Sequence, residues 1–245
     1  MPLNMEELDN KIPTGSKVLD AMLDGGYEKD IVTTIYGPAG SGKTVLCLLC
    51  AINIARIGKK VVYVDSEGGF SLERLKQITS HISQDYKKIL DEIIFLKPTS
   101  FAEQKKSFEK LKDIVNDKIG LIVVDTIAML YRLELGKNED IHEVNIELGK
   151  QISYLTEIAR KKGIPVLITN QVYADFENKD RVNIVGGDIL KYGSKCLIEL
   201  QITPNGNRRA ILRKHRSMEA EREIIFKIVE GGIIGTTESR GFKFF

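Results

Sequence analysis

The sequence predicts an α/β fold: a mainly parallel sheet flanked by helices, with antiparallel strands added at the C-terminal end. Two observations support this prediction. Up to residue 171, short β-branched apolar runs alternate with longer segments of helical periodicity, as in parallel strands joined by helices. From residue 196 onward, three apolar runs follow one another with turn residues between them, as antiparallel strands do. We expect one domain over residues 1–245.

The elements are assigned in chain order. Ser16 is placed to cap a short first helix that ends at Gly25-Gly26. Parallel strands are expected at 31–36, 60–65, 93–96, 121–125 and 165–169, and helices at 45–57, 71–81, 101–115 and 138–162. The stretch 172–194 is polar and too long for a simple connector. Antiparallel strands are expected at 196–202, 209–213 and 224–229.

The charge of the chain is nearly balanced. Its formal net charge is +2, which excludes a generally cationic surface, so any nucleic-acid site should be local. No uninterrupted apolar run reaches membrane-spanning length, and the polar, acidic first residues are not a signal peptide. Three cysteines, an odd number, indicate a reducing compartment. We expect a cytoplasmic protein without membrane contact, with Cys47 and Cys50 packed in the core of a helix.

The most informative stretch is Gly37-Pro38-Ala39-Gly40-Ser41-Gly42-Lys43-Thr44, which fits the phosphate-binding pattern G-x-x-x-x-G-K-[ST]. It stands between a predicted strand and a predicted helix, the context that the motif requires. Glycines let backbone N–H groups approach phosphate oxygens, and the helix N-terminus attracts negative charge. Lys43 adds charge at the β- and γ-phosphates, and Thr44 offers a hydroxyl to Mg²⁺. The stretch predicts a site for ATP or GTP with Mg²⁺.

Three polar residues follow other predicted strands, at the edge where ligands of parallel sheets bind. Asp125 is expected to hold Mg²⁺, or otherwise to cap a helix. Glu67 is placed to orient or deprotonate the attacking water, or to cap the next helix. Gln171 is placed to sense the γ-phosphate with its amide, or to form a turn with its neighbour.

Together these motifs resemble those of the RecA-like recombinases of archaea. The resemblance covers essentially the whole chain, and the motifs occur in the family's order. It rests on Thr14-Gly15-Ser16, the phosphate loop, Val64-Asp65-Ser66-Glu67-Gly68, Val123-Val124-Asp125-Thr126, Thr169-Asn170-Gln171-Val172 and Gly186-Gly187-Asp188-Ile189-Leu190. The chain is most similar to a short member of the family, one without the N-terminal helical DNA-binding domain.

The resemblance implies a RecA-like P-loop NTPase core that binds ATP and DNA and acts in homologous recombination and DNA repair. It implies catalytic roles for Lys43, Glu67 and Gln171, and a magnesium site at Thr44 and Asp125. It also implies that Arg74 contacts the adenine, although by its position alone Arg74 is typical of a solvated helix arginine. The expected partners are DNA, preferably single-stranded, the main archaeal recombinase RadA and other repair proteins, with weak self-association.

Three departures from the family pattern qualify this expectation. No Phe-x-x-Ala polymerisation motif occurs, and the stretch ahead of the core is too short for the linker that carries it. The loops 133–143 and 172–183 carry at least as much acid as base, and the segment 213–219 lacks the proline of the family's ATP-capping segment. We therefore expect a weak ATPase without strong strand exchange of its own, acting as a recombinase accessory or mediator.

A local basic stretch is the candidate DNA site. It comprises Arg213, Lys214, His215 and Arg216, and Lys191 and Lys195 extend it. Clustered cations attract a phosphate backbone, and such binding weakens with salt. The alternative is a solvated turn that keeps a sheet edge from pairing with other chains. A second class of function also stays open: an ATP-switched regulatory or scaffold protein of the same superfamily that acts on a protein partner.

Overall fold

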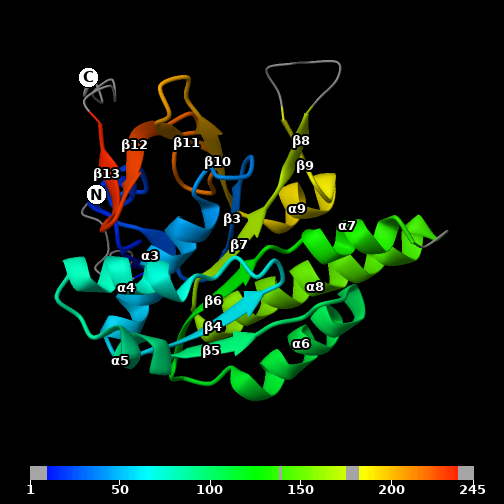
Figure 1. Cartoon of the computed structure of the whole chain (residues 1–245). Coiled ribbons are helices and arrows are strands. Elements are labelled where there is room, and N and C mark those ends of the chain that lie inside the picture. The colour runs from blue at the N-terminus through cyan, green and yellow to red at the C-terminus, as the bar shows by residue number, and fades with distance from the viewer. Residues whose placement is uncertain (1–9, 138–139, 175–181, 237–245) are drawn as a thin grey trace, which may run out of the picture.

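A computed structural model describes residues 10–137, 140–174 and 182–236 (Figure 1). Over these residues, the main sheet contains nine strands in the order β13-β12-β11-β10-β3-β7-β6-β4-β5. Five of them form one half of the sheet, with β5 at its edge: β3 (Val32–Tyr36), β4 (Lys60–Asp65), β5 (Ile93–Leu96), β6 (Ile119–Asp125) and β7 (Val166–Asn170). These five strands pair in parallel. Their carboxyl ends therefore meet at one edge of the sheet, as the sequence predicted.

The C-terminal strands extend the sheet beyond β3. They are β10 (Cys196–Ile202), β11 (Arg208–Lys214), β12 (Glu223–Val229) and β13 (Gly232–Gly235). β10 pairs in parallel with β3 and antiparallel with β11, so it is the strand at which the direction changes. The remaining pairs, β11–β12 and β12–β13, are antiparallel. The predicted antiparallel extension therefore begins one strand later than the sequence pattern indicated, at β11.

Helices cover both faces of the sheet, because the central strands are apolar on both sides. One core joins α3 (Lys43–Arg56), α4 (Leu72–His81) and α5 (Tyr86–Asp91) to strand residues such as Val61 and Tyr63. The other joins α6 (Phe101–Ile114), α7 (Met129–Leu135), α8 (Ile141–Lys162) and α9 (Gly187–Gly193) to Val62 and Val64. Neighbouring residues of β4 thus enter opposite cores, as the alternation of side chains along a strand requires.

Several short elements were not predicted from the sequence. These are α5, α7, α9, β13, the β8 (Val172–Ala174) and β9 (Val182–Ile184) hairpin, and the pair β1 (Lys11–Ile12) and β2 (Tyr27–Glu28). The expected cap at Ser16 was wrong in detail: Ser16 precedes α2 (Lys17–Met22), but its side chain makes no cap hydrogen bond. Instead, the Asp20 carboxylate accepts a hydrogen bond from the backbone N–H of Thr14 at 2.7 Å.

Cys47, Cys50 and Cys196 are free and buried, and Cys47 and Cys50 lie in the core on α3, as expected. In the described ranges, no helix combines the length and the apolar composition needed to cross a bilayer.

Candidate nucleotide-binding site

The phosphate loop joins β3 to α3, in the context that its motif requires. Gly40 and Gly42 take left-handed backbone conformations, with φ of 72° and 104°. At Gly37 a side chain is excluded by a close contact, since a Cβ would lie 2.3 Å from the carbonyl oxygen of Leu200. Gly42 is the N-cap of α3 and provides no capping side chain. The first N–H groups of the helix are therefore left for an anion such as phosphate.

Lys43 is the first residue of α3, and its side chain reaches back to the start of the phosphate loop. Its ammonium donates hydrogen bonds to the carbonyl oxygens of Gly37 and Pro38, both at 2.9 Å. Burial lowers the pKa of Lys43, while the nearby charges of Glu67 and Asp125 oppose this shift. A buried cation held by neutral carbonyl oxygens has much to gain from a phosphate group. The loop also contains the buried Ser41 hydroxyl, which has no hydrogen-bond partner among the described residues.

Asp125, at the end of β6, is 1% exposed. The Tyr63 hydroxyl donates to its Oδ2 at 3.0 Å, and the Thr169 hydroxyl donates to its Oδ1. A Cβ built on Gly69 would lie 3.6 Å from Thr44 Oγ1 and 3.8 Å from Asp125 Oδ2, so both oxygens border the same small space. Mg²⁺ prefers hard oxygen ligands and commonly uses one carboxylate together with substrate phosphates. The residues present therefore fit a magnesium–triphosphate group.

Glu67 and Gln171 come from loops after β4 and β7, and the structure brings them into contact. The Gln171 side-chain amide donates to Glu67 Oε1. Partial burial raises the pKa of Glu67, and the charge of Asp125 raises it further, whereas Lys43 and Gln171 act in the opposite direction. The neighbouring Asn170 fixes the turn, because its amide donates to the carbonyl oxygen of Val185 at 2.6 Å and its Oδ1 accepts the N–H of Gln171.

Arg74 lies on α4, away from these groups. Its guanidinium donates to the backbone carbonyl oxygens of Val229, Glu230 and Gly232, at 2.6, 3.2 and 3.3 Å. These bonds tie α4 to the turn between β12 and β13. Arg74 thus has a structural role that the sequence did not predict, and its contact with adenine stays a prediction.

The predicted DNA-binding stretch forms ion pairs within the fold. Arg213 contacts Glu199 at 2.7 Å and Glu221 at 2.5 Å. Arg216 contacts Glu28 at 2.5 Å and Asp30 at 2.6 Å. These pairs neutralise two of the cations that the sequence proposed for phosphate contact.

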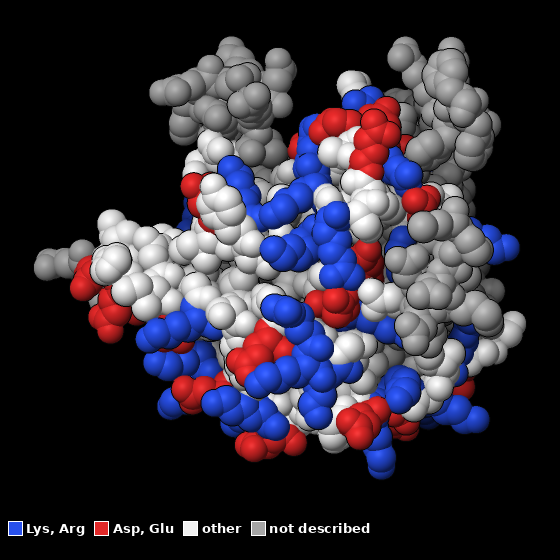
Figure 2. Space-filling view, turned by 180° about the vertical axis from the view of Figure 1, so that it is seen from behind, with Lys and Arg blue, Asp and Glu red and all other residues white. Residues whose placement is uncertain are grey.

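The other four candidate residues differ in exposure. The His215 ring is 2% exposed, and burial lowers its pKa. Lys214 donates to the carbonyl oxygens of Lys191 and Ser194, at 2.7 and 2.9 Å. Lys191 and Lys195 are exposed. Figure 2 shows basic side chains gathered on the rear face of the molecule, with acidic side chains among them.

Four residues that support the site were missed by the sequence reasoning: Tyr63, Thr169, Gly69 and Arg208. The Arg208 guanidinium donates to the carbonyl oxygen of Gly40 at 3.1 and 3.3 Å, so β11 braces the phosphate loop. Tyr63 lies within an apolar strand run, where the sequence offers no local signal for its hydroxyl. Gly69 had a signal, since it stands in the Ser66-Glu67-Gly68-Gly69 turn after a strand, and Thr169 stands in the motif Thr169-Asn170-Gln171-Val172, although no supporting role was assigned to either.

This fold and this site define a P-loop NTPase core of the RecA type. The model of the Rad51 family matches residues 8–236. A DNA repair and recombination protein RadB of Methanobrevibacter smithii is 45% identical, covering 94% of this chain and 98% of the relative. The RadB protein of Methanococcoides burtonii is 38% identical, covering 94% and 100%. A RadB recombinase crystal structure matches with a TM-score of 0.79 at 38% identity, covering 90% and 97%. The chain belongs to the Rad51 family and, within it, to the archaeal RadB proteins.

Proposed function

We propose that this chain is an ATP- and DNA-binding protein of archaeal homologous recombination and DNA repair, a weak ATPase that assists the main recombinase RadA. The observation that carries the ATPase proposal is the contact of Glu67 with Gln171, beside the buried Lys43 and Asp125. Membership of the Rad51 family and the names of the relatives support the role in recombination and repair.

The geometry of the site supports the following roles for its residues. The loop N–H groups and Lys43 would bind the phosphates, and Thr44 and Asp125 would hold Mg²⁺, which would supply charge neutralisation for the phosphates. Glu67 orients the attacking water and accepts its proton, since a carboxylate with a raised pKa is a better base. Gln171 holds Glu67 in place and senses the γ-phosphate with its amide. A change at Gln171 is passed to the neighbouring turn, which Asn170 holds through its hydrogen bond to the carbonyl oxygen of Val185.

Two substitutions separate ATP binding from hydrolysis. Lys43→Ala should abolish ATP binding, because the loop loses its only lysine and its charge on the phosphates. Glu67→Gln should keep the affinity for ATP and lower turnover by about 10²–10⁴-fold, the range for a lost general base. Fluorescent-nucleotide titration and phosphate release measure the two properties. A Glu67→Gln variant that hydrolyses ATP at the normal rate would refute the assignment of the base.

The DNA proposal centres on the exposed lysines. Lys191→Ala with Lys195→Ala should weaken single-stranded DNA binding several-fold, whereas Lys227→Ala on the exposed side of β12 is the matched control. Neutralising Lys214 and Arg216 tests the rest of the stretch. Because few cations there are uncompensated, we expect log affinity to fall with log salt at a slope of about −2, as for about three neutralised phosphates. Filter binding measures all of these values.

One observation favours the second candidate, an ATP-switched regulatory or scaffold protein that acts on a protein partner. Arg213 and Arg216 are paired with acids of the same chain, which explains the basic stretch without DNA. For this second candidate, we expect the immobilised protein to retain RadA in the absence of DNA and only when ATP is present. The substitutions Lys191→Ala and Lys195→Ala should leave this retention unchanged. Unchanged DNA affinity in those variants would also favour the second candidate.

A further inference from the structure

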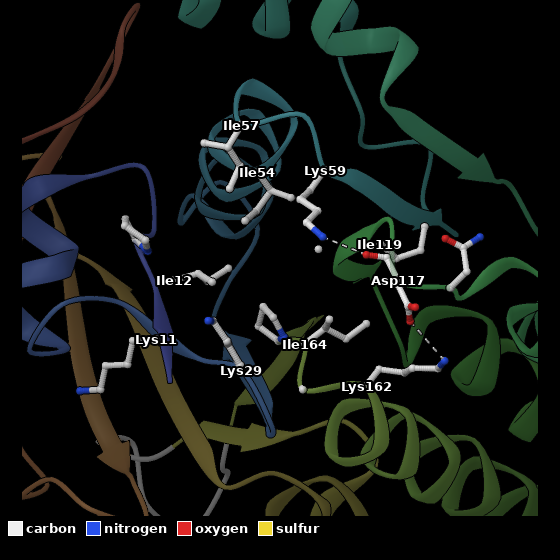
Figure 3. Close-up of a pocket in the computed structure, with 15 residues that line it drawn as sticks. Lys11, Ile12, Lys29, Ile54, Ile57, Lys59, Asp117, Ile119, Lys162 and Ile164 are labelled. Carbon is white, nitrogen blue, oxygen red and sulfur yellow. Dashed lines mark hydrogen bonds and ion pairs between the residues drawn. The ribbon is translucent and has the colours of Figure 1, made fainter. Parts of the chain in front are cut away.

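A cavity of about 440 Å³ lies at the amino-terminal edge of the sheet, opposite the nucleotide site (Figure 3). This volume lies within the ~300–1,000 Å³ typical of ligand pockets. The cavity is lined by β1, by the end of α3, by the turn before β6 and by the turn between α8 and β7. None of the residues with proposed roles in ATP or DNA binding belongs to it, so it calls for a separate explanation.

The floor of the cavity is apolar and built by close packing. It consists of Ile12, Ile54, Ile119, Ile164 and two prolines. Gly120 lets α3 press against the start of β6, because a Cβ there would lie 2.8 Å from Ile54 Cγ2 and 2.9 Å from Lys59 Cβ. This close packing of Ile54 and Lys59 against Gly120 indicates that this wall of the cavity is preformed.

The rim contains an exposed apolar side chain. Ile57 follows the last turn of α3 and is 65% exposed, one of the largest exposed fractions among the apolar residues that the structure describes. Figure 3 shows it beside Ile54, on the α3 side of the cavity. An apolar partner side chain that fills the cavity would bury Ile57 as well.

The cavity is also basic. Among the described residues that line it, Lys11, Lys29, Lys59 and Lys162 are basic and Asp117 is acidic. The Lys11 ammonium points away from the cavity and donates to the carbonyl oxygens of Leu23 and Asp24, at 2.9 and 3.3 Å, so the charge at the cavity comes mainly from Lys59 and Lys162. Lys59 donates to the Asp117 carbonyl oxygen at 2.9 Å, a neutral group that leaves the charge of the lysine uncompensated. Lys162 approaches the Asp117 carboxylate at 3.9 Å, but that carboxylate is fully exposed, so this pair is weak.

We propose that this cavity docks a peptide segment of a partner protein that carries an aliphatic anchor residue flanked by carboxylates. The isoleucine floor matches the anchor, and the lysines match the acids. Nucleic acid fits less well, because none of the described residues that line the cavity has an aromatic side chain on which a base could stack. The inference goes beyond ATP and DNA binding and does not depend on either.

Docking here leaves the nucleotide site open. α3 begins at Lys43 in the phosphate loop and ends beside Ile57, 14 residues later. At 1.5 Å per residue the helix is roughly 21 Å long, and the two sites lie at its opposite ends. A docked peptide and bound ATP can therefore occupy the protein at the same time.

Peptide selection tests the proposal and does not require the partner to be identified first. The full chain is immobilised and offered a random dodecapeptide library on phage, with counter-selection on the Ile57→Asp and Lys59→Glu variants. We expect enrichment of peptides with an aliphatic residue between acids. The selected peptides, labelled with fluorescein, should bind the wild-type protein with Kd below about 100 µM. Ile57→Asp and Lys59→Glu should each raise this Kd at least tenfold.

Matched controls come from β12 and β13. Ile234 is 51% exposed and pairs with Lys227 across these strands, so Ile234→Asp and Lys227→Glu repeat both changes elsewhere and should alter Kd less than twofold. Nucleotide titration and a melting curve confirm that each variant is folded. No enrichment, enriched peptides without acids, equal binding to the cavity variants, or displacement of the peptide by an equimolar dT oligonucleotide each overturn the proposal.

Discussion

The Asp125 carboxylate is oriented by hydroxyls from the strands on either side of β6. Tyr63 is fully buried, and burial together with the charge of Asp125 raises the pKa of its hydroxyl, so Tyr63 stays a hydrogen-bond donor throughout the neutral range. Thr169 donates to the other carboxylate oxygen. A magnesium ligand held in this way needs little reorganisation when the ion binds.

Tyr63→Phe tests this arrangement. The substitution removes one oxygen and retains the ring that packs against Phe70 and Phe95. We expect the Mg²⁺ concentration for half-maximal ATP binding to rise about 10-fold, the lower range for loss of a group that orients a ligand. Magnesium titration with a fluorescent ATP analogue measures the change. Tyr36→Phe, which affects a hydroxyl beside Glu199, is the control and should leave the midpoint unchanged.

At the scale of the elements, α8 contains a glycine whose replacement should stabilise the helix. Gly149 lies inside this 22-residue helix, and a Cβ there would meet nothing within 4 Å. Alanine has a higher helix propensity than glycine and removes conformational freedom from the unfolded chain.

Gly149→Ala should therefore raise the free energy of unfolding by about 1 kcal/mol, as measured by urea denaturation. Gly193→Ala is the contrasting variant, because its Cβ would lie 2.3 Å from Ile152 Cγ2 and should destabilise the protein. Stabilisation by Gly193→Ala, or none by Gly149→Ala, would contradict this account of helix packing.

The long elements could be predicted from the sequence because their signals are local. The phosphate loop is a contiguous motif, and β6 is a contiguous apolar run. By contrast, α5, α7 and α9 have six or seven residues each, a length at which a helix depends on tertiary packing rather than on its own sequence. The ion pairs of the basic stretch could not be predicted either, because they also depend on tertiary structure. The acids that pair with Arg216 are Glu28 and Asp30, nearly 190 residues away in sequence.

At the scale of the whole molecule, ion pairs join the N-terminal segment to the connection between β11 and β12. Glu28 contacts both Arg216 and, at 3.7 Å, the buried His215 ring, and Arg222 contacts Asp24 at 2.7 Å. Burial lowers the pKa of His215, with Lys11, Arg216 and Arg222 acting in the same direction and Glu28 against it. The native state therefore keeps the ring neutral over a pH range in which the unfolded chain binds a proton.

Stability should accordingly fall as the pH drops below about 6.5, the pKa of an unfolded histidine, and the fall should stop below the folded pKa. In His215→Asn, the decrease in melting temperature between pH 7 and pH 5.5 should be smaller than in wild type, whatever the absolute values. His81→Asn, on the exposed surface of α4, should leave the decrease as it is. Melting curves at several pH values test this, and an equal decrease in His215→Asn would exclude the buried ring as its source.

The packing of α2 has a consequence for biosynthesis. This helix follows shortly after β1, yet it contacts β12 and β13, and its Leu19 and Met22 share a core with Phe226. On the ribosome, these side chains cannot complete their packing against β12 and β13 until the chain has grown past residue 229. Nascent chains stalled before that point should therefore recruit chaperones or remain protease-sensitive at the N-terminal segment, although the phosphate loop and the central strands are already synthesised.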